Sequence, residues 1–391
     1  MIKRKMAYQI QEYFTARCDE MEAMVKTLAN FETPSRNSDA QTDIIEFLIE
    51  KFRNVGYTAI HVPGKLTGGY LYLRPIARQT HKPVQLLVGH CDTVWPLGTI
   101  ASMPVANENG TLKGPGVFDM KAGITQMYFC LKAIHDMALN PEVVPVILIN
   151  SDEEIGSHES TTAIRRLAKI AQRAYILEPP LGLDGKLKTA RKGIGKYTLK
   201  VCGVSAHAGL DPGKGASAII ELSHQIQKLF EMNDFSRGIT VNVGMIEGGI
   251  SPNVIAPESK AVIDVRVLTK SDAEWIEEQI MALQPENPET EISVSGHFGR
   301  PPLEKNARNN ALWAAAETQG EIIGLHLKES VAGGGSDGNT TSLYCATLDG
   351  LGTVGDGAHA EHEFIFLDKL VERTTLLTLL VTMPPMSKNN N

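Results

Sequence analysis

Side chains that bind divalent metals stand at five places along this chain, and their order predicts a two-metal hydrolase. The places are His90, Asp119, the adjacent pair Glu153 and Glu154, Glu178, and His359. Two borderline-soft divalent cations that share a site prefer imidazole and carboxylate ligands, with one carboxylate bridging both ions. Four of the five places follow a run typical of a buried strand, directly or after a short turn, where α/β folds place their catalytic groups.

Asp92 stands two residues after His90 in a segment that we expect to be extended. Residues two apart in an extended chain point to the same side, so Asp92 can accept a hydrogen bond from the second imidazole N–H of His90. That bond would fix the tautomer of His90 that binds a metal ion. Taken alone, the two residues are better explained as a strand-end histidine and a turn-forming aspartate.

The adjacent acids Glu153 and Glu154 need an explanation, because neighbouring carboxylates repel each other. A division of roles supplies one: Glu154 binds metal, while Glu153 takes a proton from the attacking water. The alternative is a solvated helix N-terminus, where acidic residues are common. Asp119 has an alternative as the cap of the helix that follows it, and Glu178, before two prolines, as an exposed turn residue.

Length, charge and cysteine content exclude several classes of protein. A chain of 391 residues favours two domains, and a formal net charge of −7 argues against nucleic acid as a partner. No apolar run approaches the length of a membrane span, and we expect neither membrane insertion nor a signal peptide. Five widely spread cysteines without a C-x-x-C pair indicate reduced thiols and a cytoplasmic location.

The expected elements divide the chain into three parts. Strands near 70–74, 84–89, 143–150 and 174–177 alternate with helices at 122–137 and 160–171, which predicts a mostly parallel sheet flanked by helices. The order β-α-β-β-α-β within 191–300 predicts an inserted ferredoxin-like α+β domain. The catalytic domain then consists of residues 1–190 and 301–391, ending in a polar tail at 387–391 that we expect to be disordered.

Four segments together resemble the M20 family of metallopeptidases, and within it the glutamate carboxypeptidase (carboxypeptidase G) group. They are His90-Cys91-Asp92-Thr93-Val94, the stretch from Gly114 to Gly123 around Asp119, Ser151-Asp152-Glu153-Glu154-Ile155-Gly156-Ser157, and Ser205-Ala206-His207-Ala208-Gly209. The resemblance implies a zinc-exopeptidase-like catalytic domain with an inserted lid and dimerisation domain. It also implies two zinc ions per chain, with Co²⁺ or Mn²⁺ as substitutes.

The resemblance further implies a role for each residue of the site. Asp119 and a water or hydroxide would bridge the two ions. One ion would also be held by Glu154 and His359, and the other by His90 and Glu178. Asp92 would orient His90, and Glu153 would act as general base and then as general acid. In dimeric members, the residue that matches His207 reaches the partner's active site and stabilises the oxyanion.

Substrate-binding positions follow from the same resemblance. Lys186, Asn253, Arg266 and Arg300 match positions used for the substrate carboxylate or for the lid. Gly334 lies in a glycine-rich turn, 333–337, of the kind found beside the substrate, and this turn lacks the ending of a phosphate loop. The chain departs from the carboxypeptidase G pattern at Arg191-Lys192, which adds basic charge, and at His362, which offers a competing ligand three residues after His359.

The predicted activity is hydrolysis of an amide bond that releases a C-terminal amino acid, with glutamate as one candidate, by metal-bound hydroxide. The substrate would be a small peptide or an N-acyl amino acid, and the protein a homodimer formed through the inserted domain. One alternative is an N-acyl-amino-acid deacylase that resembles acetylornithine or succinyl-diaminopimelate deacylases. An alternative of another class is a metal-bearing binding protein without catalysis, although a purely structural site would not need Glu153.

Overall fold

The computed structural model describes residues 2–77 and 79–386, and the expectation for the tail at 387–391 lies outside the described residues. The chain forms two compact units. Unit 1 consists of Met1–Thr189, Lys305–Val331 and Ser336–Asn391, and unit 2 of Ala190–Glu304 and Ala332–Gly335. The sequence places the corresponding boundaries at 190/191 and 300/301. It gives no sign that the short segment Ala332–Gly335 groups with unit 2.

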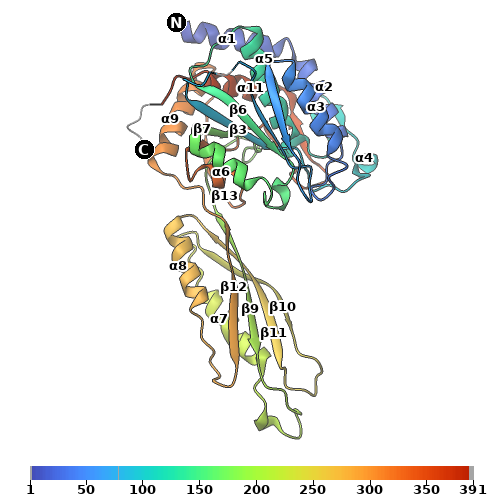
Figure 1. Ribbon diagram of the computed structural model, residues 1–391, viewed down its shortest axis with the longest axis vertical. Coiled ribbons are helices and arrows are strands. Elements are labelled where there is room, and N and C mark those ends of the chain that lie inside the picture. Colours follow the sequence, from blue (N-terminus) through green and yellow to red (C-terminus); the bar gives the residue numbers. More distant parts are fainter. Residues whose placement is uncertain (1, 78, 387–391) are drawn as a thin grey trace. The chain divides into compact units, whose positions relative to one another are not determined.

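The centre of unit 1 is a six-stranded sheet with the order β1-β2-β6-β3-β7-β14 (Figure 1). Its strands are β1 (Tyr57–Val62), β2 (Tyr70–Pro75), β3 (Val84–His90), β6 (Val144–Asn150), β7 (Ala171–Ile176) and β14 (Ala346–Leu348). The four strands β6, β3, β7 and β14 run parallel, whereas β1 and β2 pair antiparallel at one side. This confirms the predicted mixed α/β fold with a mostly parallel sheet.

Helices cover both faces of this sheet because its central strands are apolar on both sides. Leu87 and Ile147 belong to the larger core, on the face covered by α2 (Cys18–Asn30), α5 (Ala122–Asp136) and α11 (Leu367–Val381). Their neighbours Leu86 and Leu148 pack on the other face against α6 (Thr161–Ile170). Continuous burial of a strand on two faces is the pattern expected of a parallel sheet between helical layers.

The remaining elements of unit 1 surround this core. The helices are α1 (Ile2–Thr15), α3 (Thr42–Arg53), α4 (Thr99–Ser102), α9 (Ala307–Ile322) and α10 (Asp337–Thr341), with short turns η1 (Val117–Lys121) and η2 (Glu153–Ile155). A small sheet of order β15-β16-β5-β4 joins β4 (Ala106–Glu108), β5 (Thr111–Lys113), β15 (Gly355–Asp356) and β16 (Phe364–Phe366). Two further strands, β8 (Leu187–Arg191) and β13 (Glu329–Ala332), pair with each other, and each begins in unit 1 and ends in unit 2.

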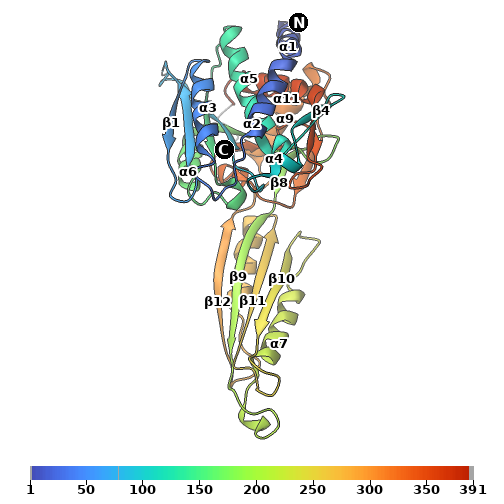
Figure 2. The ribbon, with the colours of Figure 1, turned by 90° about the vertical axis from the view of Figure 1, so that its right-hand side faces the viewer.

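Unit 2 is an antiparallel four-stranded sheet with the order β10-β11-β9-β12 and two helices on one face (Figure 2). Its elements are β9 (Gly193–Cys202), η3 (Pro212–Lys214), α7 (Ala218–Glu231), β10 (Thr240–Gly248), β11 (Glu258–Val267), α8 (Lys270–Met281) and β12 (Glu291–Arg300). Alternate residues of β9 and β11 are buried against α7 and α8, as a half-buried sheet requires. The other sheet face carries the intervening residues and has no helix of unit 2 on it.

The elements that the sequence predicts individually agree with these bounds to within about five residues, whereas the strands β4, β5, β8 and β13 to β16 have no individual prediction. Strand β1 was not predicted, because its burial falls off after Tyr57 and no clear alternation marks it. None of the helices in the described part of the chain has the length and apolar composition needed to span a bilayer.

Candidate metal centre

The parallel strands of unit 1 deliver four of the acidic and imidazole residues to one edge of the sheet. His90 is the last residue of β3, Glu153 and Glu154 form the turn η2 just after β6, and Glu178 lies two residues beyond the end of β7. Because β6, β3 and β7 are neighbours and run in the same direction, their carboxyl ends meet. This is the edge at which open α/β sheets bind their ligands.

Asp119 lies between two groups of donor atoms. It belongs to η1, the turn that precedes α5, and the Asp119–Met120 peptide is cis. Its Oδ1 lies 3.2 Å from His90 Nε2, and the same imidazole nitrogen is 3.4 Å from Glu178 Oε1. Its Oδ2 lies 3.4 Å from His359 Nε2, which is 3.1 Å from Glu154 Oε2. One carboxylate therefore faces one imidazole–carboxylate pair with each of its oxygens.

His359 comes from the loop between β15 and β16, in the last part of unit 1. It adopts a left-handed conformation with φ +61°, which is uncommon for a residue with a side chain. The loop packs tightly, because a Cβ added to Gly357 would lie 2.9 Å from the Cα of Glu363. Half of the His359 side chain is exposed, whereas His90 is fully buried.

Asp92 joins His90 to the turn that carries the two glutamates. Its carboxylate lies 3.4 Å from His90 Nδ1, but the shorter contact of that nitrogen, 3.0 Å, is with the backbone carbonyl of Asp92 itself. The carboxylate accepts hydrogen bonds from the backbone N–H groups of Glu153 and Glu154 and from the Ser35 hydroxyl. Asp92 thus orients the imidazole mainly through its main chain and fixes η2 through its side chain.

The acidic groups stabilise positive charge at the two imidazoles. Burial by itself would lower the pKa of His90, but hydrogen bonds with Asp119, Asp92 and Glu178 outweigh burial and raise it well above its usual value. Hydrogen bonds with Asp119 and Glu154 raise the pKa of His359 to about 10. Burial would raise the pKa of Asp119, yet the two histidines hold it below its usual range. Bound cations would satisfy these carboxylates and displace the imidazole protons.

The donor set fits divalent metal ions. Two groups have ligand atoms that all lie within 4.8 Å of one another: His90, Asp119 and Glu154 form one, and His90, Glu153 and Glu178 the other. Glu154 Oε1 is buried and has no hydrogen-bond partner among the described residues. A buried carboxylate oxygen without a donor is costly unless a cation occupies its vicinity. Imidazole and carboxylate together are ligands that zinc accepts.

His207 and Asn253 lie together in unit 2. His207 forms an isolated bridge with Val254, and the backbone N–H of Ala208 donates to the Asn253 carbonyl at 3.0 Å. The backbone N–H groups of Gly209 and Leu210 both donate to His207 Nδ1 at 3.1 Å. Since Nδ1 accepts these bonds, the proton of the neutral ring is on Nε2. The exposed side chain therefore offers an N–H donor to a neighbouring group.

The predicted substrate-binding positions have separate surroundings. In unit 1, Lys186 lies 3.5 Å from Asp184 Oδ2, in the loop that follows Glu178. In unit 2, Arg266 and Arg300 stand on either side of Ile194, on the sheet face without helices. Arg266 contacts Asp264 and donates to the Gly333 carbonyl at 2.9 Å.

The glycine-rich turn and His362 complete the predicted positions. The carbonyl of Gly334 accepts a hydrogen bond from Arg191 Nη1 at 3.1 Å. The basic residue that departs from the family pattern thus holds this turn within unit 2. His362 is exposed and belongs to neither group of candidate metal ligands found among the described residues.

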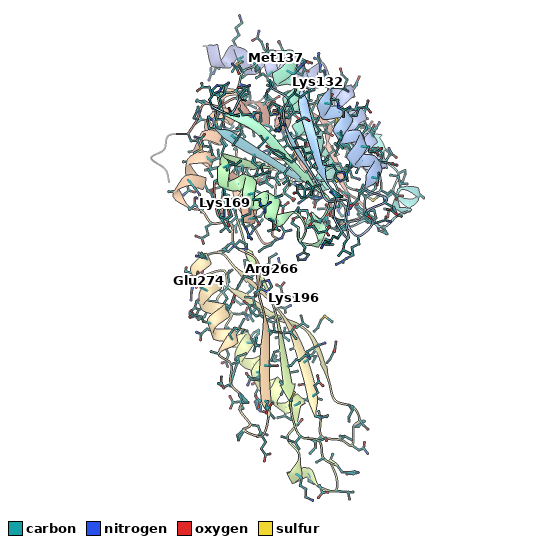
Figure 3. The ribbon with its side chains drawn as sticks, in the orientation of Figure 1. Lys132, Met137, Lys169, Lys196, Arg266 and Glu274 are labelled. Atoms are coloured by element: carbon teal, nitrogen blue, oxygen red, sulfur yellow. The ribbon has the colours of Figure 1, made fainter. Side chains whose placement is uncertain are left out.

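Sequence reasoning missed two kinds of residue near these groups. Glu363 is a buried carboxylate that accepts a hydrogen bond from the backbone N–H of Asp119, and Trp95 donates to the same carboxylate. Burial raises the pKa of Glu363 to about 7, although hydrogen bonds from backbone N–H groups oppose this rise. In unit 2, Lys196 lies beside Ile194 and Arg266 on the same face, as Figure 3 shows for Lys196 and Arg266. Only strand register could have identified it.

The chain thus has a six-stranded, mostly parallel sheet with clustered carboxylates and imidazoles at its carboxyl edge, and comparisons with known proteins show which proteins it resembles. Residues 189–289 match the M20 peptidase dimerisation domain. The chain is 27% identical to carboxypeptidase G2 of a Pseudomonas species, over 94% of this chain and 91% of that one. It is 26% identical to succinyl-diaminopimelate desuccinylase of Dechloromonas aromatica, over 83% and 89% of the two chains.

Solved structures show the same fold. Aminopeptidase PepT of Bacillus cereus superposes with a TM-score of 0.77 and 21% identity, over 95% of this chain and 98% of that one. The YXEP protein of Bacillus subtilis, described as a dinuclear metal-binding peptidase of the M20 family, gives a TM-score of 0.69 and 13% identity, over 94% and 98%. Together with the sequence similarities, this fold supports an M20 carboxypeptidase-like protein with hydrolase activity.

Proposed function

We propose that this chain is a dinuclear zinc hydrolase that cleaves an amide bond and releases an amino acid with a free carboxylate. The observation that carries the proposal is the position of Asp119, with one oxygen toward His90 and Glu178 and the other toward His359 and Glu154. Each set offers one imidazole and one carboxylate besides the shared one. This is the composition that a pair of zinc ions bridged by a carboxylate requires.

The residues around this site have distinct roles in the proposal. Bound zinc would polarise the scissile carbonyl and lower the pKa of the attacking water. Glu153 would accept the proton of that water and pass it to the leaving amine. Glu153 suits this role because it belongs to the same turn as Glu154 and lies in one donor group with His90 and Glu178. The Asp92 carboxylate would keep Glu153 in place by accepting a hydrogen bond from the backbone N–H of Glu153.

A cationic side chain would recognise the free carboxylate of the leaving amino acid. Lys186 is a candidate in unit 1, and Arg266, Arg300 and Asn253 are candidates in unit 2. The similarity to carboxypeptidase G2 supports a carboxypeptidase, with glutamate as one candidate for the released residue. The similarity to succinyl-diaminopimelate desuccinylase supports a second candidate, an N-acyl-amino-acid deacylase, since both reactions release an amino acid with a free carboxylate.

The test compares N-acyl amino acids and dipeptides with the same compounds amidated at the carboxyl end. A cation that loses its charged partner typically costs on the order of 2–5 kcal/mol, so we expect kcat/KM to fall at least ~30-fold on amidation. Zinc-free protein is the control and should be inactive on both. Equal rates for acids and amides would contradict the carboxypeptidase and deacylase proposals and favour an aminopeptidase, the activity named for the PepT structure.

We further propose a homodimer formed through unit 2, in which His207 and Asn253 act at the partner's site. The match to a dimerisation domain supports this, as does the apolar surface of α7 and β10, where Ile220 and Ile246 are 59% and 65% exposed. The Nε2–H of His207 would donate to the oxyanion. We also propose a cytoplasmic location, which the five free cysteines support.

A further inference from the structure

We infer that Glu363 is a positioning residue that fixes Asp119, and with it the metal site; this inference rests on the proposed dinuclear centre. Glu363 is 1% exposed and lies four residues after His359, just before β16. Both oxygens of its carboxylate accept hydrogen bonds from N–H groups, which leaves Glu363 outside the proposed ligand set. Its carboxylate contacts the backbone around Asp119 and the side chain of Trp95.

Four N–H groups donate to the Glu363 carboxylate, two to each oxygen. Oε1 accepts from the backbone N–H groups of Phe118 and Asp119 at 2.9 and 3.0 Å. Oε2 accepts from the backbone N–H of Gly116 at 2.9 Å and from Trp95 Nε1 at 3.1 Å. Hydrogen bonds to an ionised acceptor are stronger than neutral ones, so this carboxylate holds η1 from one side.

These contacts join three segments that each carry a proposed ligand. The backbone N–H of Asp119 itself is one of the donors. Trp95 stands five residues after His90 and three after Asp92, and Glu363 is in the loop of His359. The main chain adds a further tie, because the backbone N–H of Gly114 donates to the Glu363 carbonyl at 3.2 Å. A shift of Glu363 would therefore move Asp119 relative to both histidines.

An amide cannot replace this carboxylate. Glutamine at 363 would offer one acceptor oxygen and one NH₂ group, so in either orientation the NH₂ group would face two N–H donors. If its oxygen stayed on Phe118 and Asp119, the NH₂ group would oppose Gly116 and Trp95. Trp95→Phe removes one of those donors and leaves a ring of similar size. The double variant should consequently lose less zinc affinity than the separate losses of the two single variants predict.

The experiment measures zinc binding by the full chain, in competition with a chromophoric chelator, together with thermal unfolding of the zinc-free protein. Glu363→Gln should weaken zinc binding ~10–100-fold, the range found when groups behind metal ligands are changed. Trp95→Phe should weaken it by a smaller factor, and the double variant should bind better than the product of the two factors. The matched control is Glu361→Gln, the same change at an exposed residue two positions away, which should bind as wild type does.

The possible outcomes separate this inference from the proposed function. A wild-type chain that binds no divalent metal would overturn the proposed function. A Glu363→Gln variant with wild-type zinc affinity would overturn the positioning role. If the unfolding temperature of that variant fell while its zinc affinity stayed unchanged, Glu363 would be a purely structural residue. Should Glu363→Gln not fold, Trp95→Phe decides: unchanged zinc affinity in that variant rejects the inference, and weaker binding supports it.

Discussion

At the scale of single residues, the site depends on neighbours with different environments. Glu153 and Glu154 are adjacent in η2, yet only Glu154 lies 3.1 Å from His359 and has a buried oxygen without a hydrogen-bond partner among the described residues. Burial raises the pKa of Glu154, which a bound cation would reverse. These differences support the proposal that Glu154 is a ligand and that Glu153 transfers the proton.

Substitution by glutamine should separate the two roles. Glu153→Gln should keep two zinc ions per chain and lose activity by ~10²–10⁴-fold, the typical range for a general base. Glu154→Gln should instead lose zinc, because an amide is a poorer ligand than a carboxylate. Elemental analysis of the dialysed variants, beside kcat, measures both effects, with the exposed Glu142→Gln as control. Equal zinc loss in the two variants would show that the assignment is wrong.

The residues that sequence reasoning could identify are those that touch the proposed ions, since type, order and position after a buried strand all mark them. Glu363 and Trp95 carry no such signal. Their hydrogen bonds join residues more than 240 positions apart in the chain. From the sequence alone, a glutamate in a loop that also carries a histidine is most simply explained as a solvent-exposed residue. The hydrogen bonds between the Asp92 carboxylate and η2 could not be predicted for the same reason, because their donors are backbone N–H groups.

At the scale of elements, apolar runs and period-two alternation sufficed for the parallel strands β3, β6 and β7 and for unit 2, but not for the three-residue parallel strand β14. They failed for β1, whose alternation is weak, and for the ends of β10, β11 and β12, which extend beyond their apolar parts. Hydrogen bonds to neighbouring strands keep these polar end residues in the extended conformation. The sequence of a single segment does not reveal which strands it will pair with. The same limit hid Glu221 of α7, a buried acid on the apolar face of a helix.

Glu221 should stabilise the connection between α8 and β12. Its carboxylate accepts hydrogen bonds from the backbone N–H groups of Glu286 and Asn287 and from Gln225. Glu221→Gln should lower the free energy of local opening by about 1–3 kcal/mol, because a buried acceptor is lost. Hydrogen exchange at the amides of 286 and 287 measures this, with the exposed Glu231→Gln as control.

The effect of Glu221 should also depend on pH. Burial works to raise its pKa, but hydrogen bonds from Asn287, Gln225 and Glu286 outweigh burial and lower it. A carboxyl whose pKa is lower in the folded state stabilises fully above its unfolded value, and this contribution is lost as pH falls through the folded one. The difference between wild type and Glu221→Gln should accordingly shrink on acidification. A difference that grows at low pH would contradict the ionised role.

At the scale of the whole molecule, the proposed catalytic groups are divided between the two units. The proposed ligands and Glu153 are in unit 1, whereas His207, Asn253, Arg266 and Arg300 are in unit 2. The match to the M20 peptidase dimerisation domain covers most of unit 2, and the apolar positions Ile220 and Ile246 of this unit are exposed. In a two-fold dimer each chain can complete the site of the other. The sequence predicts this arrangement only by resemblance, because no pattern within one chain specifies its partner.

A mixture of two inactive variants tests whether the site is shared between chains. His207→Ala should lower turnover by ~10²–10³-fold at unchanged zinc content, the usual effect of removing one oxyanion donor. Mixed with Glu153→Gln, it should regain activity. Random pairing makes about half of the dimers mixed, and each mixed dimer has one intact site of two, so about a quarter of wild-type activity should return.

Mass spectrometry of differently tagged chains verifies that subunits exchange. His326→Ala, an exposed histidine of unit 1, is the control and should be active by itself. If mixed dimers form and activity stays at the level of the separate variants, His207 acts within its own chain or has no role in turnover.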